Sequence, residues 1–410
     1  MNIWKGLLLG SALLGLASSL AIPAQAATVS GRASTVLEWY DDPEEDTALP
    51  VYQYLQLNVR DLAPGYHFKL YGRLGDDIND EDSDAKSELY YAYLEKKNLV
   101  QGLDFRLGRQ FIATTAGASL MDGLALDYTF LKDYKLKLFG GGDVTYYEGY
   151  NVKDVIAGVE LGGSFFDDSL DVAASYLQKW DGGLLAQELV GFDASLDLDG
   201  KLWLYNESQW DVLSERLSYE LVGAKYRFEA PFTLRAEYLY SLPVFSSTSI
   251  YSVFAVEEYE EIMAEATWMV QPGVQTFLRV TRELYDEFDD ANVFELGVEK
   301  LATGNCSGYL VGTVRRDDDG QNMHGIKAYG SYRFFSPLQA GLGVSVDVLE
   351  REIDYFDTDV DSDETTQNRF WADVLWKVSD KINVEGKVER VESDLWDYYN
   401  RGRVRLNILF

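Results

Sequence analysis

Apolar and polar residues alternate along most of this chain, from about residue 27 to its end. The clearest example is the pair Val51–Leu62 and Tyr66–Gly75, which the turn-forming triplet Ala63-Pro64-Gly65 connects. In the second segment, every other residue from Phe68 to Leu74 is apolar or glycine, and lysine, tyrosine and arginine stand between them. A period of two is typical of β-strands with one face toward an apolar medium and the other toward water.

This unit recurs as about ten alternating residues, a short turn, about ten more, and a longer acidic loop. Further segments of this kind are Leu103–Gln110, Tyr134–Gly140, Asp154–Gly162, Leu170–Leu177, Phe232–Tyr240, Ala291–Leu301, Gly325–Phe334, Phe370–Val378 and Lys381–Val391. With the weaker segments included, the pattern predicts about 22 strands, between roughly 20 and 24, and bacterial single-chain barrels have an even number.

The connections fall into two classes. Short turns include Lys132-Asp133, Asp167-Asp168-Ser169, Ala230-Pro231, Gln271-Pro272-Gly273 and Ser379-Asp380, whereas Asp41–Pro50, Asp76–Lys86, Tyr285–Asp290 and Glu350–Asn368 are longer and acidic. Such alternation is typical of membrane barrels, with short turns at the periplasmic rim and long loops outside. We therefore predict an all-β fold, a transmembrane antiparallel up-and-down β-barrel, in which 27–410 form a single domain. A soluble β-sandwich also has alternating strands, but its apolar faces close an internal core.

Both ends of the chain indicate the same compartment. Phe410, Ile408 and Leu406 are apolar at alternate positions, and an aromatic residue ending such a strand resembles the signal that the barrel-assembly machinery recognises. Residues 1–26 carry one cation, Lys5, then an apolar run and small residues up to Ala26, which is typical of a cleaved secretory signal peptide. We therefore expect the outer membrane of a Gram-negative bacterium, with membrane lipid and lipopolysaccharide around the barrel.

Composition narrows the function classes. The 28 tyrosines and 20 phenylalanines suit the aromatic girdles of a membrane barrel, and after the leader no segment approaches the roughly 18 apolar residues of a transmembrane helix. The formal charge of −32 would repel nucleic acid. The single cysteine, Cys306, excludes an internal disulfide, a c-type haem attachment motif and a cysteine-based metal site.

The sequence offers no catalytic constellation. Its two histidines, His67 and His324, are expected near opposite rims, with an apolar band of roughly 25 Å between them. The acidic run Asp357–Glu364 spaces its carboxylates like a calcium loop, but Ser362 stands where such a loop needs glycine. We interpret this run and Asp80–Asp84 as solvated loop tips, bridged loosely by divalent cations to lipopolysaccharide. The prediction is a protein without catalytic residues, metal site or cofactor.

If the apolar set faces lipid, the charged residues between them line the lumen. The residues predicted in this way are Arg60, Lys69, Arg73, Arg106, Lys135, Lys137, Glu160, Glu295, Glu299, Asp373, Glu385 and Glu389. Earlier strands contribute mainly cations and later strands mainly acids, an arrangement that would set a transverse field across the water. A water-lined face also carries mixed charge without design, and Arg235, Lys327 and Lys387 interrupt the separation.

Three consecutive segments carry a family resemblance: Glu88–Leu94, Leu103–Gln110 and Asp122–Tyr128. Their order resembles that of outer-membrane porins, most of all the monomeric, alginate-export-like branch. The resemblance implies a pore with Arg106 and Arg109 on or near the lumen wall, and it does not identify the solute. The acidic balance of the remaining predicted lumen departs from a strongly basic alginate channel.

The expected width of the bore also bears on function. Barrels of about 22 strands are usually plugged, yet the first predicted strand starts near Thr28, which leaves no room for a plug ahead of it. No long inward-folding third loop is expected, since the longest connection is Glu350–Asn368. An empty bore would leak, so either the strand count is high, the loops fold in, or another polypeptide occupies it.

These observations leave two functional interpretations. The first is a porin-like channel for passive passage of hydrophilic solutes or ions. In the second, the chain resembles the barrel component of porin–cytochrome conduits, which sheathes a multihaem c-type cytochrome for electron transfer across the outer membrane.

Overall fold

All regular structure in the described residues is β-strand. The computed structural model describes residues 27–41, 47–79, 86–131, 133–145, 151–229, 231–245, 247–248, 258–286, 289–317, 322–351, 363–393 and 396–410. The strands are β1 (Thr28–Asp41), β2 (Thr47–Ala48), β3 (Pro50–Ala63), β4 (Tyr66–Asp77), β5 (Glu88–Val100), β6 (Leu103–Thr114), β7 (Gly117–Phe130), β8 (Tyr134–Asp143), β9 (Val155–Phe165), β10 (Leu170–Asp181), β11 (Leu184–Leu198), β12 (Leu202–Asp211), β13 (Arg216–Arg227), β14 (Phe232–Ser241), β15 (Tyr259–Gln271), β16 (Val274–Tyr285), β17 (Ala291–Lys300), β18 (Cys306–Asp317), β19 (Met323–Phe335), β20 (Leu338–Arg351), β21 (Asp363–Lys377), β22 (Ile382–Ser393) and β23 (Trp396–Leu409).

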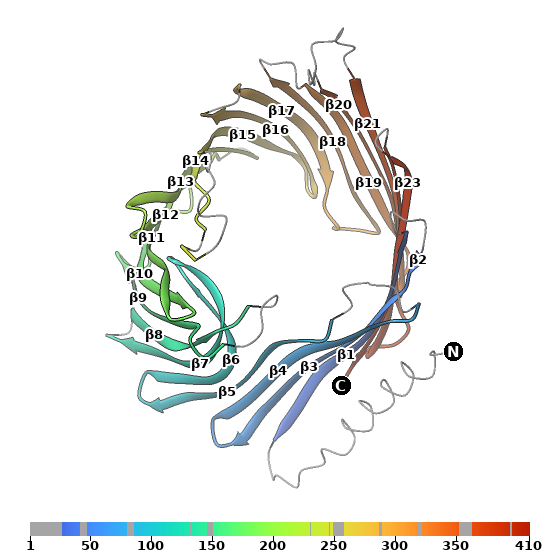
Figure 1. Cartoon of the computed structure of the whole chain (residues 1–410). Helices are drawn as coiled ribbons and strands as arrows, with labels where there is room; N and C mark the ends of the chain where they lie inside the picture. The colour runs from blue at the N-terminus through green and yellow to red at the C-terminus, as the bar shows by residue number, and fades with distance from the viewer. Residues whose placement is uncertain are drawn as a thin grey trace.

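These strands form one sheet that closes on itself. Each long strand pairs antiparallel with its neighbours in sequence, and β1 completes the circle by pairing with β23, from Arg32 opposite Leu409 to Tyr40 opposite Arg401. The two-residue β2 lies beside the end of β1, so 22 long strands make the wall. Figure 1 shows the ring from one end, with the first and last strands side by side. The predicted all-β, up-and-down barrel of about 22 strands is confirmed.

Some predicted features lie outside the described residues. They are the signal peptide (1–26), the acidic run Asp80–Asp84, and all but the last two residues of Asp357–Glu364. At the other end of the chain, Phe410 joins the ring of hydrogen bonds: its N–H donates to Gly31 O at 3.1 Å, and Gly31 N–H donates to Phe410 O at 2.9 Å. Phe410, which with Leu406 and Ile408 is predicted to form an assembly signal, thus lies at the closure itself.

The outer face of the sheet is apolar. On β17, Phe294, Leu296 and Val298 are 45%, 63% and 41% exposed, and Glu295 and Glu299 alternate with them on the opposite face. This arrangement recurs around the ring, and it suits a closed barrel whose outer side chains contact hydrocarbon and whose strands leave no unpaired edge. In the described part of the chain there is no helix long and apolar enough to cross a bilayer.

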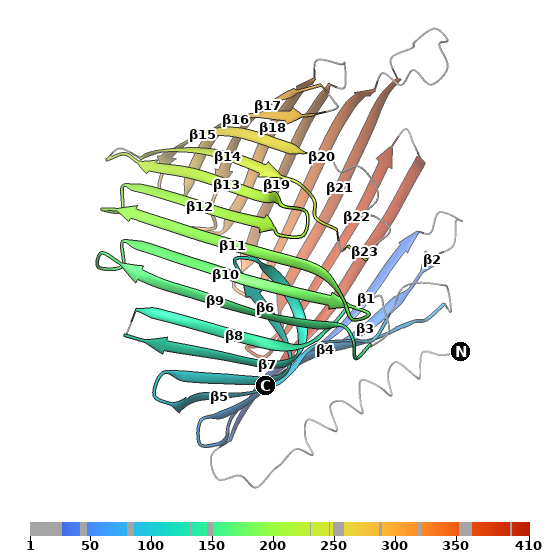
Figure 2. The same ribbon diagram turned by 60° about the vertical axis from the view of Figure 1, so that its left-hand side comes forward.

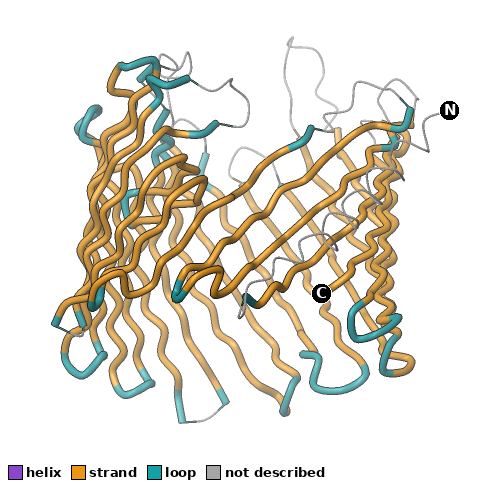
Figure 3. Tube along the Cα trace, turned by 90° about the horizontal axis from the view of Figure 1, so that it is seen from below, coloured by secondary structure: helices purple, strands orange, loops and turns teal. Residues whose placement is uncertain are grey.

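Tight turns gather at the rim where the chain ends. Four of these turns contain a glycine in the left-handed region, Gly65 (φ 74°), Gly102 (79°), Gly200 (66°) and Gly273 (79°), where a side chain would strain the backbone. Asp167 and Asp168, in the predicted turn between β9 and β10, also have positive φ, which aspartate tolerates better than most residues. Figure 3 shows the strands running obliquely between the two rims, as barrel closure requires.

Aromatic rings lie flat over glycines of the neighbouring strand. Trp371 covers Gly343, and Tyr329 covers Gly341, so closely that a Cβ at either glycine would overlap the ring. The two rings lie 6.3 Å apart with an angle of 7° between their planes, both facing the lumen. Glycine at these positions allows the ring to pack against the backbone, which joins β19, β20 and β21 more tightly than side-chain contact alone.

We predict that Gly343→Val destabilises the barrel by about 1–3 kcal/mol, because the valine must displace the Trp371 ring. The measurement is unfolding in urea, which is monitored by the difference in gel mobility between the folded and the unfolded barrel. The matched control is Gly312→Val on the outer face of β18, where a Cβ meets nothing within 4 Å, and its stability should stay within about 0.5 kcal/mol of the parent. Equal unfolding midpoints for the two variants would contradict the packing described here.

Candidate functional site

The strand registers show on which face each candidate residue lies. All of the predicted lumen residues except Arg109 lie on the face opposite the exposed apolar side chains: Arg60, Lys69, Arg73, Arg106, Lys135, Lys137, Glu160, Glu295, Glu299, Asp373, Glu385 and Glu389. Several form ion pairs there, namely Lys69 with Glu95 (3.1 Å), Arg73 with Glu88 (3.2 Å), Arg106 with Asp127 (3.1 Å) and Lys137 with Glu160 (2.7 Å). The wall is therefore a lattice of paired charges.

Arg109 differs from Arg106. It lies on the opposite face of β6, together with Leu107 and Phe111, because an odd number of positions separates the two arginines in a regular strand. Its guanidinium forms a two-pronged pair with Asp122, with Nε–Oδ1 at 2.8 Å and Nη2–Oδ2 at 2.7 Å. Arg106 and Arg109 therefore lie on opposite faces of β6, and Arg109 is at the position where the pairing of β6 with β5 ends.

The end of the β6–β7 hairpin folds into the bore (Figures 1 and 2). Ala116 N–H donates to Ser175 Oγ at 2.6 Å, and Thr115 N–H donates to Glu160 Oε2 at 3.0 Å. From the other side, Gln209 Nε2 donates to Ala116 O at 2.6 Å. These three partners are lumen-facing residues of β10, β9 and β12, so the hairpin tip lies across the inner wall.

The sequence predicted no long inward-folding third loop but left open that loops fold into the bore, and the structure shows one connection that folds in. The element that does so is a hairpin whose strands outrun their neighbour. Pairing between β5 and β6 reaches only Ala92 and Arg109, whereas pairing between β6 and β7 continues to Thr114 and Gly117. The end of the hairpin has no strand on its β5 side, and it turns inward to find other partners.

An apolar cluster lies under the inturned hairpin. Its members come from the hairpin and from the inner faces of β8 to β11: Ile112, Ala116, Met121, Ala125, Phe139, Ile156, Leu177 and Leu189. Each large member stabilises the inturned position by about 1.5–3 kcal/mol through burial. A channel interior that is otherwise polar thus contains one small hydrophobic core, and that core holds the hairpin against the wall.

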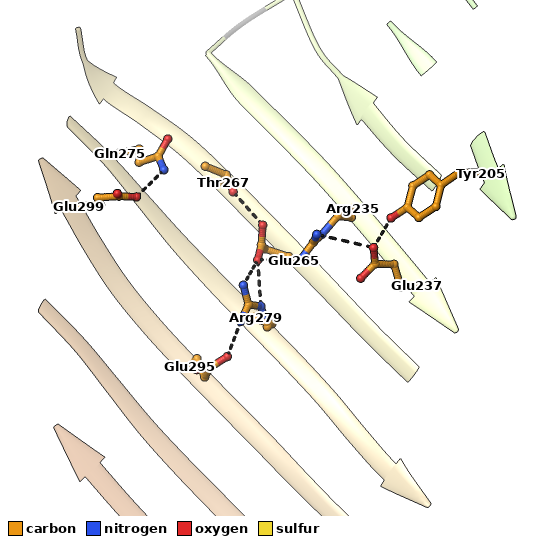
Figure 4. A network of polar contacts seen from close by, with 9 residues as sticks. All are labelled: Tyr205, Arg235, Glu237, Glu265, Thr267, Gln275, Arg279, Glu295 and Glu299. Carbon is orange, nitrogen blue, oxygen red and sulfur yellow. Dashed lines mark hydrogen bonds and ion pairs between the residues drawn. The ribbon is translucent and has the colours of Figure 1, made fainter. Parts of the chain in front are cut away.

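A row of alternating charge crosses β14 to β17 on the lumen side (Figure 4). Arg235, Glu265, Arg279 and Glu295 are direct neighbours in the strand registers. Arg279 lies 2.6 Å from Glu265 and 2.9 Å from Glu295, and Arg235 lies 3.5 Å from Glu265. The side chains are partly exposed to lumen water, so each pair contributes at most about 1 kcal/mol, and the row acts mainly by fixing the positions of its charges.

Glu389 is the centre of a second cluster. Its carboxylate is 4% exposed and contacts Arg369 at 2.8 Å, Lys387 at 3.0 Å and Arg401 at 2.5 Å. Three cations from β21, β22 and β23 therefore converge on one acid. The carboxylate holds together the strands that precede the closure.

The charge separation predicted for the lumen exists, but at a different place in the ring. Cations outnumber acids on β21–β23, β1, β3 and β4, where they are Arg369, Lys377, Lys387, Arg401, Arg403, Arg405, Arg32, Arg60, Lys69 and Arg73. Acids outnumber cations on β9–β17, with Glu160, Asp171, Asp193, Glu207, Glu237, Glu261, Glu265, Glu283, Glu295 and Glu299. Closure creates the basic arc, because it places the three arginines of β23 beside β1 and β3.

A tyrosine cluster covers the lumen face of the basic arc. Neighbouring ring centroids lie 4.8 to 6.2 Å apart among Tyr52, Tyr54, Tyr71, Tyr90, Tyr91 and Tyr93. Three cations lie over these rings: Arg73 over Tyr52, Lys69 over Tyr93 and Arg405 over Tyr54. Sequence reasoning missed this cluster, although the run of tyrosines at 90, 91 and 93 signalled it.

Catalytic and metal-binding groups do not assemble in the described residues. His67 lies near the short turn between β3 and β4, where its Nδ1 accepts from Asp61 N–H at 3.3 Å, and His324 lies on β19 next to the opposite rim. In the described ranges no three His, Cys, Asp or Glu side chains are grouped as metal ligands would be. Cys306 is exposed and free.

Comparison with known proteins places the chain in no family. No protein-family model and no curated protein matches it. Among solved structures it is similar to OccK3 (OpdO) of Pseudomonas aeruginosa (11% identity, TM-score 0.46, 94% of this chain and 96% of that one) and to OccAB3 of Acinetobacter baumannii (8%, 0.47, 94% and 100%). It is similar also to the PapC translocation pore of the P pilus usher (10%, 0.47, 93% and 99%). Likeness at this level assigns neither a family nor a solute.

The class of the protein follows from its own geometry. A closed ring of 22 antiparallel strands, apolar outside and charged inside, is a channel-like barrel of the outer-membrane type.

We predict that Glu389→Gln lowers the free energy of unfolding by about 1–3 kcal/mol, because three cations then face one another without a counter-charge. Urea unfolding measures the loss. The control is Glu392→Gln on the same strand, since the ion pair of Glu392 in the described part of the chain is with the exposed Arg390, and its removal should cost at most about 1 kcal/mol. A Glu389→Gln barrel as stable as this control would show that the cluster does not hold the strands together.

Proposed function

We propose that this protein is an outer-membrane channel that passes hydrophilic solutes or ions passively through its charged lumen. The single observation that carries the proposal is the division of the wall into an apolar outer face and a charged inner face on every side of a closed ring. The apolar outer face can contact the hydrocarbon of a bilayer, and the charged inner face encloses a space that water can fill.

The bore is wide, and the hairpin narrows it. With 22 strands spaced about 4.8 Å apart and tilted by about 40°, a circular barrel would measure about 44 Å between opposite backbones. Side chains occupy about 5 Å of this at each wall. The inturned end of β6 and β7 takes up part of the remaining space. This narrowing favours a channel for small solutes and disfavours an unobstructed pore.

A second candidate is the sleeve of a porin–cytochrome complex, with a multihaem c-type cytochrome in the lumen. The tyrosine cluster favours this sleeve, together with Arg73 and Arg405, which lie over its rings. The reason is that tyrosine and arginine are enriched among the residues that carry most of the binding energy of protein–protein interfaces. Co-purification of a haem-staining protein, with conductance only after it is stripped away, would favour the sleeve over the channel.

The channel proposal predicts stepwise, stable conductance when the purified barrel is added to a planar bilayer. A barrel that is folded, by its gel mobility, and gives no current steps would overturn the proposal. The same preparation, checked for haem, separates the two candidates.

The membrane orientation can be tested by cysteine labelling in a Cys306→Ser background. Leu296→Cys on the outer face should be protected from a water-soluble maleimide in reconstituted vesicles, whereas Glu295→Cys, its neighbour in sequence, should react. The reason is that successive residues of a strand face lipid and water in turn. The reverse labelling pattern would contradict the assignment of faces.

If the inturned hairpin narrows the bore, weakening its attachment to the wall should change the single-channel conductance. Ser175→Ala combined with Gln209→Ala removes three of the hydrogen bonds that hold Ala116 and Thr115 and leaves the bond from Thr115 N–H to Glu160, which weakens the tether by about 3 kcal/mol at about 1 kcal/mol for each hydrogen bond removed. We expect larger and noisier single-channel conductance. Ser331→Ala, which removes a lumen hydroxyl bonded to Ser307 on a distant wall, should leave the conductance unchanged. Identical currents in all three barrels would show that the hairpin does not narrow the bore.

A further inference from the structure

A recess of about 530 Å³ hollows the lumen wall across β16 to β21. Small side chains form its floor, where Thr313, Gly325 and Ser345 are direct neighbours of larger lumen residues in the strand registers. Its volume lies within the roughly 300–1,000 Å³ that small-molecule sites occupy. The recess is therefore large enough to receive a small organic solute from the lumen water.

Lys327 contributes an ammonium group to the recess. Lys327 belongs to its lining, and in the described part of the chain it has no carboxylate within ion-pair distance. Its Nζ lies 5.9 Å from the centroid of the Tyr309 ring. A cation held over an aromatic ring, next to water, is free to bind an anionic group of a solute.

Three carboxylates share the lining of the recess with this ammonium. Glu295 is bound by Arg279 at 2.9 Å, Glu299 accepts from Gln275 Nε2 at 2.9 Å, and Asp347 accepts from Ser345 Oγ at 2.8 Å. An ionised carboxylate accepts about four hydrogen bonds, so each retains capacity for a further donor. Glu299 and Asp347 have no cationic partner among the described residues, and Glu299, which lies opposite Tyr309 in the strand register, is the one beside the aromatic side of the recess.

The recess also offers apolar surface. Phe277, Tyr309 and Val311 line it on the side of Glu299. Phe277 lies over Gly297, and this position presents the ring to the lumen. An apolar group on the solute would be covered by these side chains while its charged groups remain at Lys327 and the carboxylates.

The position of the recess in the ring explains its mixed charge. The acidic part of the wall ends at β17 with Glu295 and Glu299, and the basic part begins at β21 with Arg369. The strands between them carry Lys327 and Asp347. A solute in the recess therefore lies at the boundary between the acidic arc and the basic arc. A dipolar solute could align its positive end with the acids and its negative end with the cations.

We propose that this recess binds small amphoteric solutes: molecules with a carboxylate and an ammonium on one apolar skeleton, such as an α-amino acid with an aromatic side chain. The carboxylate binds Lys327, the ammonium binds Glu299, and the side chain lies against Phe277 and Tyr309. A simple anion would meet the three carboxylates, and a simple cation would meet Lys327, so the site disfavours both. This inference rests on the proposed channel function and adds a solute class to it.

Three probes share one ring and differ only in charge: phenylalanine, 3-phenylpropanoate, which lacks the amine, and 2-phenylethylamine, which lacks the carboxylate. Each is titrated against the single-channel current of the purified barrel at neutral pH. We expect phenylalanine to reduce the current at a concentration about tenfold lower than either analogue, the factor that one charged hydrogen bond carries. Equal potency of the three probes would overturn the inference.

Variants separate the two charged contacts. Lys327→Gln should abolish the preference for phenylalanine over 2-phenylethylamine, and Glu299→Gln should abolish the preference over 3-phenylpropanoate. The matched control is Lys377→Gln, which removes the same charge from the lumen face of β21 outside the recess and should keep both preferences. A Lys327→Gln barrel that discriminates like the parent would contradict the assignment.

Calorimetry of the detergent-solubilised barrel with the same probes keeps the two proposals distinguishable. A barrel without current that still binds phenylalanine about tenfold more tightly than the analogues would refute the channel and support the recess. A conducting barrel that shows no such preference, by current or by heat, would leave the channel intact and refute the recess.

Discussion

The constraint on which the structure depends is that backbone N–H and C=O groups in hydrocarbon must find partners within the protein. A single sheet satisfies it only by closing, and here the pairing of β1 with β23 performs the closure, from Arg32 and Leu409 to Tyr40 and Arg401. The reciprocal hydrogen bonds of Gly31 and Phe410 extend this seam to the last residue. Once the ring is closed, every side chain must point to lipid or to water, and the period of two along each strand distributes them accordingly.

Closure also determines the electrostatics of the interior. Residues far apart in sequence become neighbours at the seam, so the arginines of β23 join those of β1, β3 and β4 in one basic arc. Lateral ion pairs such as those of Glu389 and Arg279 then fix the charges on adjacent strands. The hairpin β6–β7 is the informative exception. Where its pairing with β5 ends, the requirement for partners persists, and the hairpin meets it by turning onto the side chains of Glu160, Ser175 and Gln209 and onto an apolar cluster.

The sequence was sufficient for those features that depend on local periodicity. The segments Val51–Leu62 and Tyr66–Gly75 became β3 and β4 within a few residues, and Glu295 and Glu299 lie on the lumen face because their apolar neighbours define the other one. Features set by pairing between strands could not be read in this way. A register shift opposite Gly72 lets both Tyr90 and Tyr91 contact Tyr71, which a strict alternation forbids. The inward turn of the hairpin depends on where β5 stops pairing with β6, and the basic arc depends on which strands meet at closure.

A wide ring cannot select solutes by diameter alone, so any selectivity must come from what projects into the bore and from what its wall can bind. The hairpin and the wall contribute in different ways. The hairpin reduces the area open to every solute, whereas the boundary between the acidic and basic arcs offers a position where opposite charges stand within one recess. Since dissolved salt screens charges in water over about 8–10 Å, only a solute close to the wall senses this arrangement. Selectivity therefore requires contact with the wall, and the recess at β16–β21 is where the described wall combines depth, aromatic surface and both signs of charge.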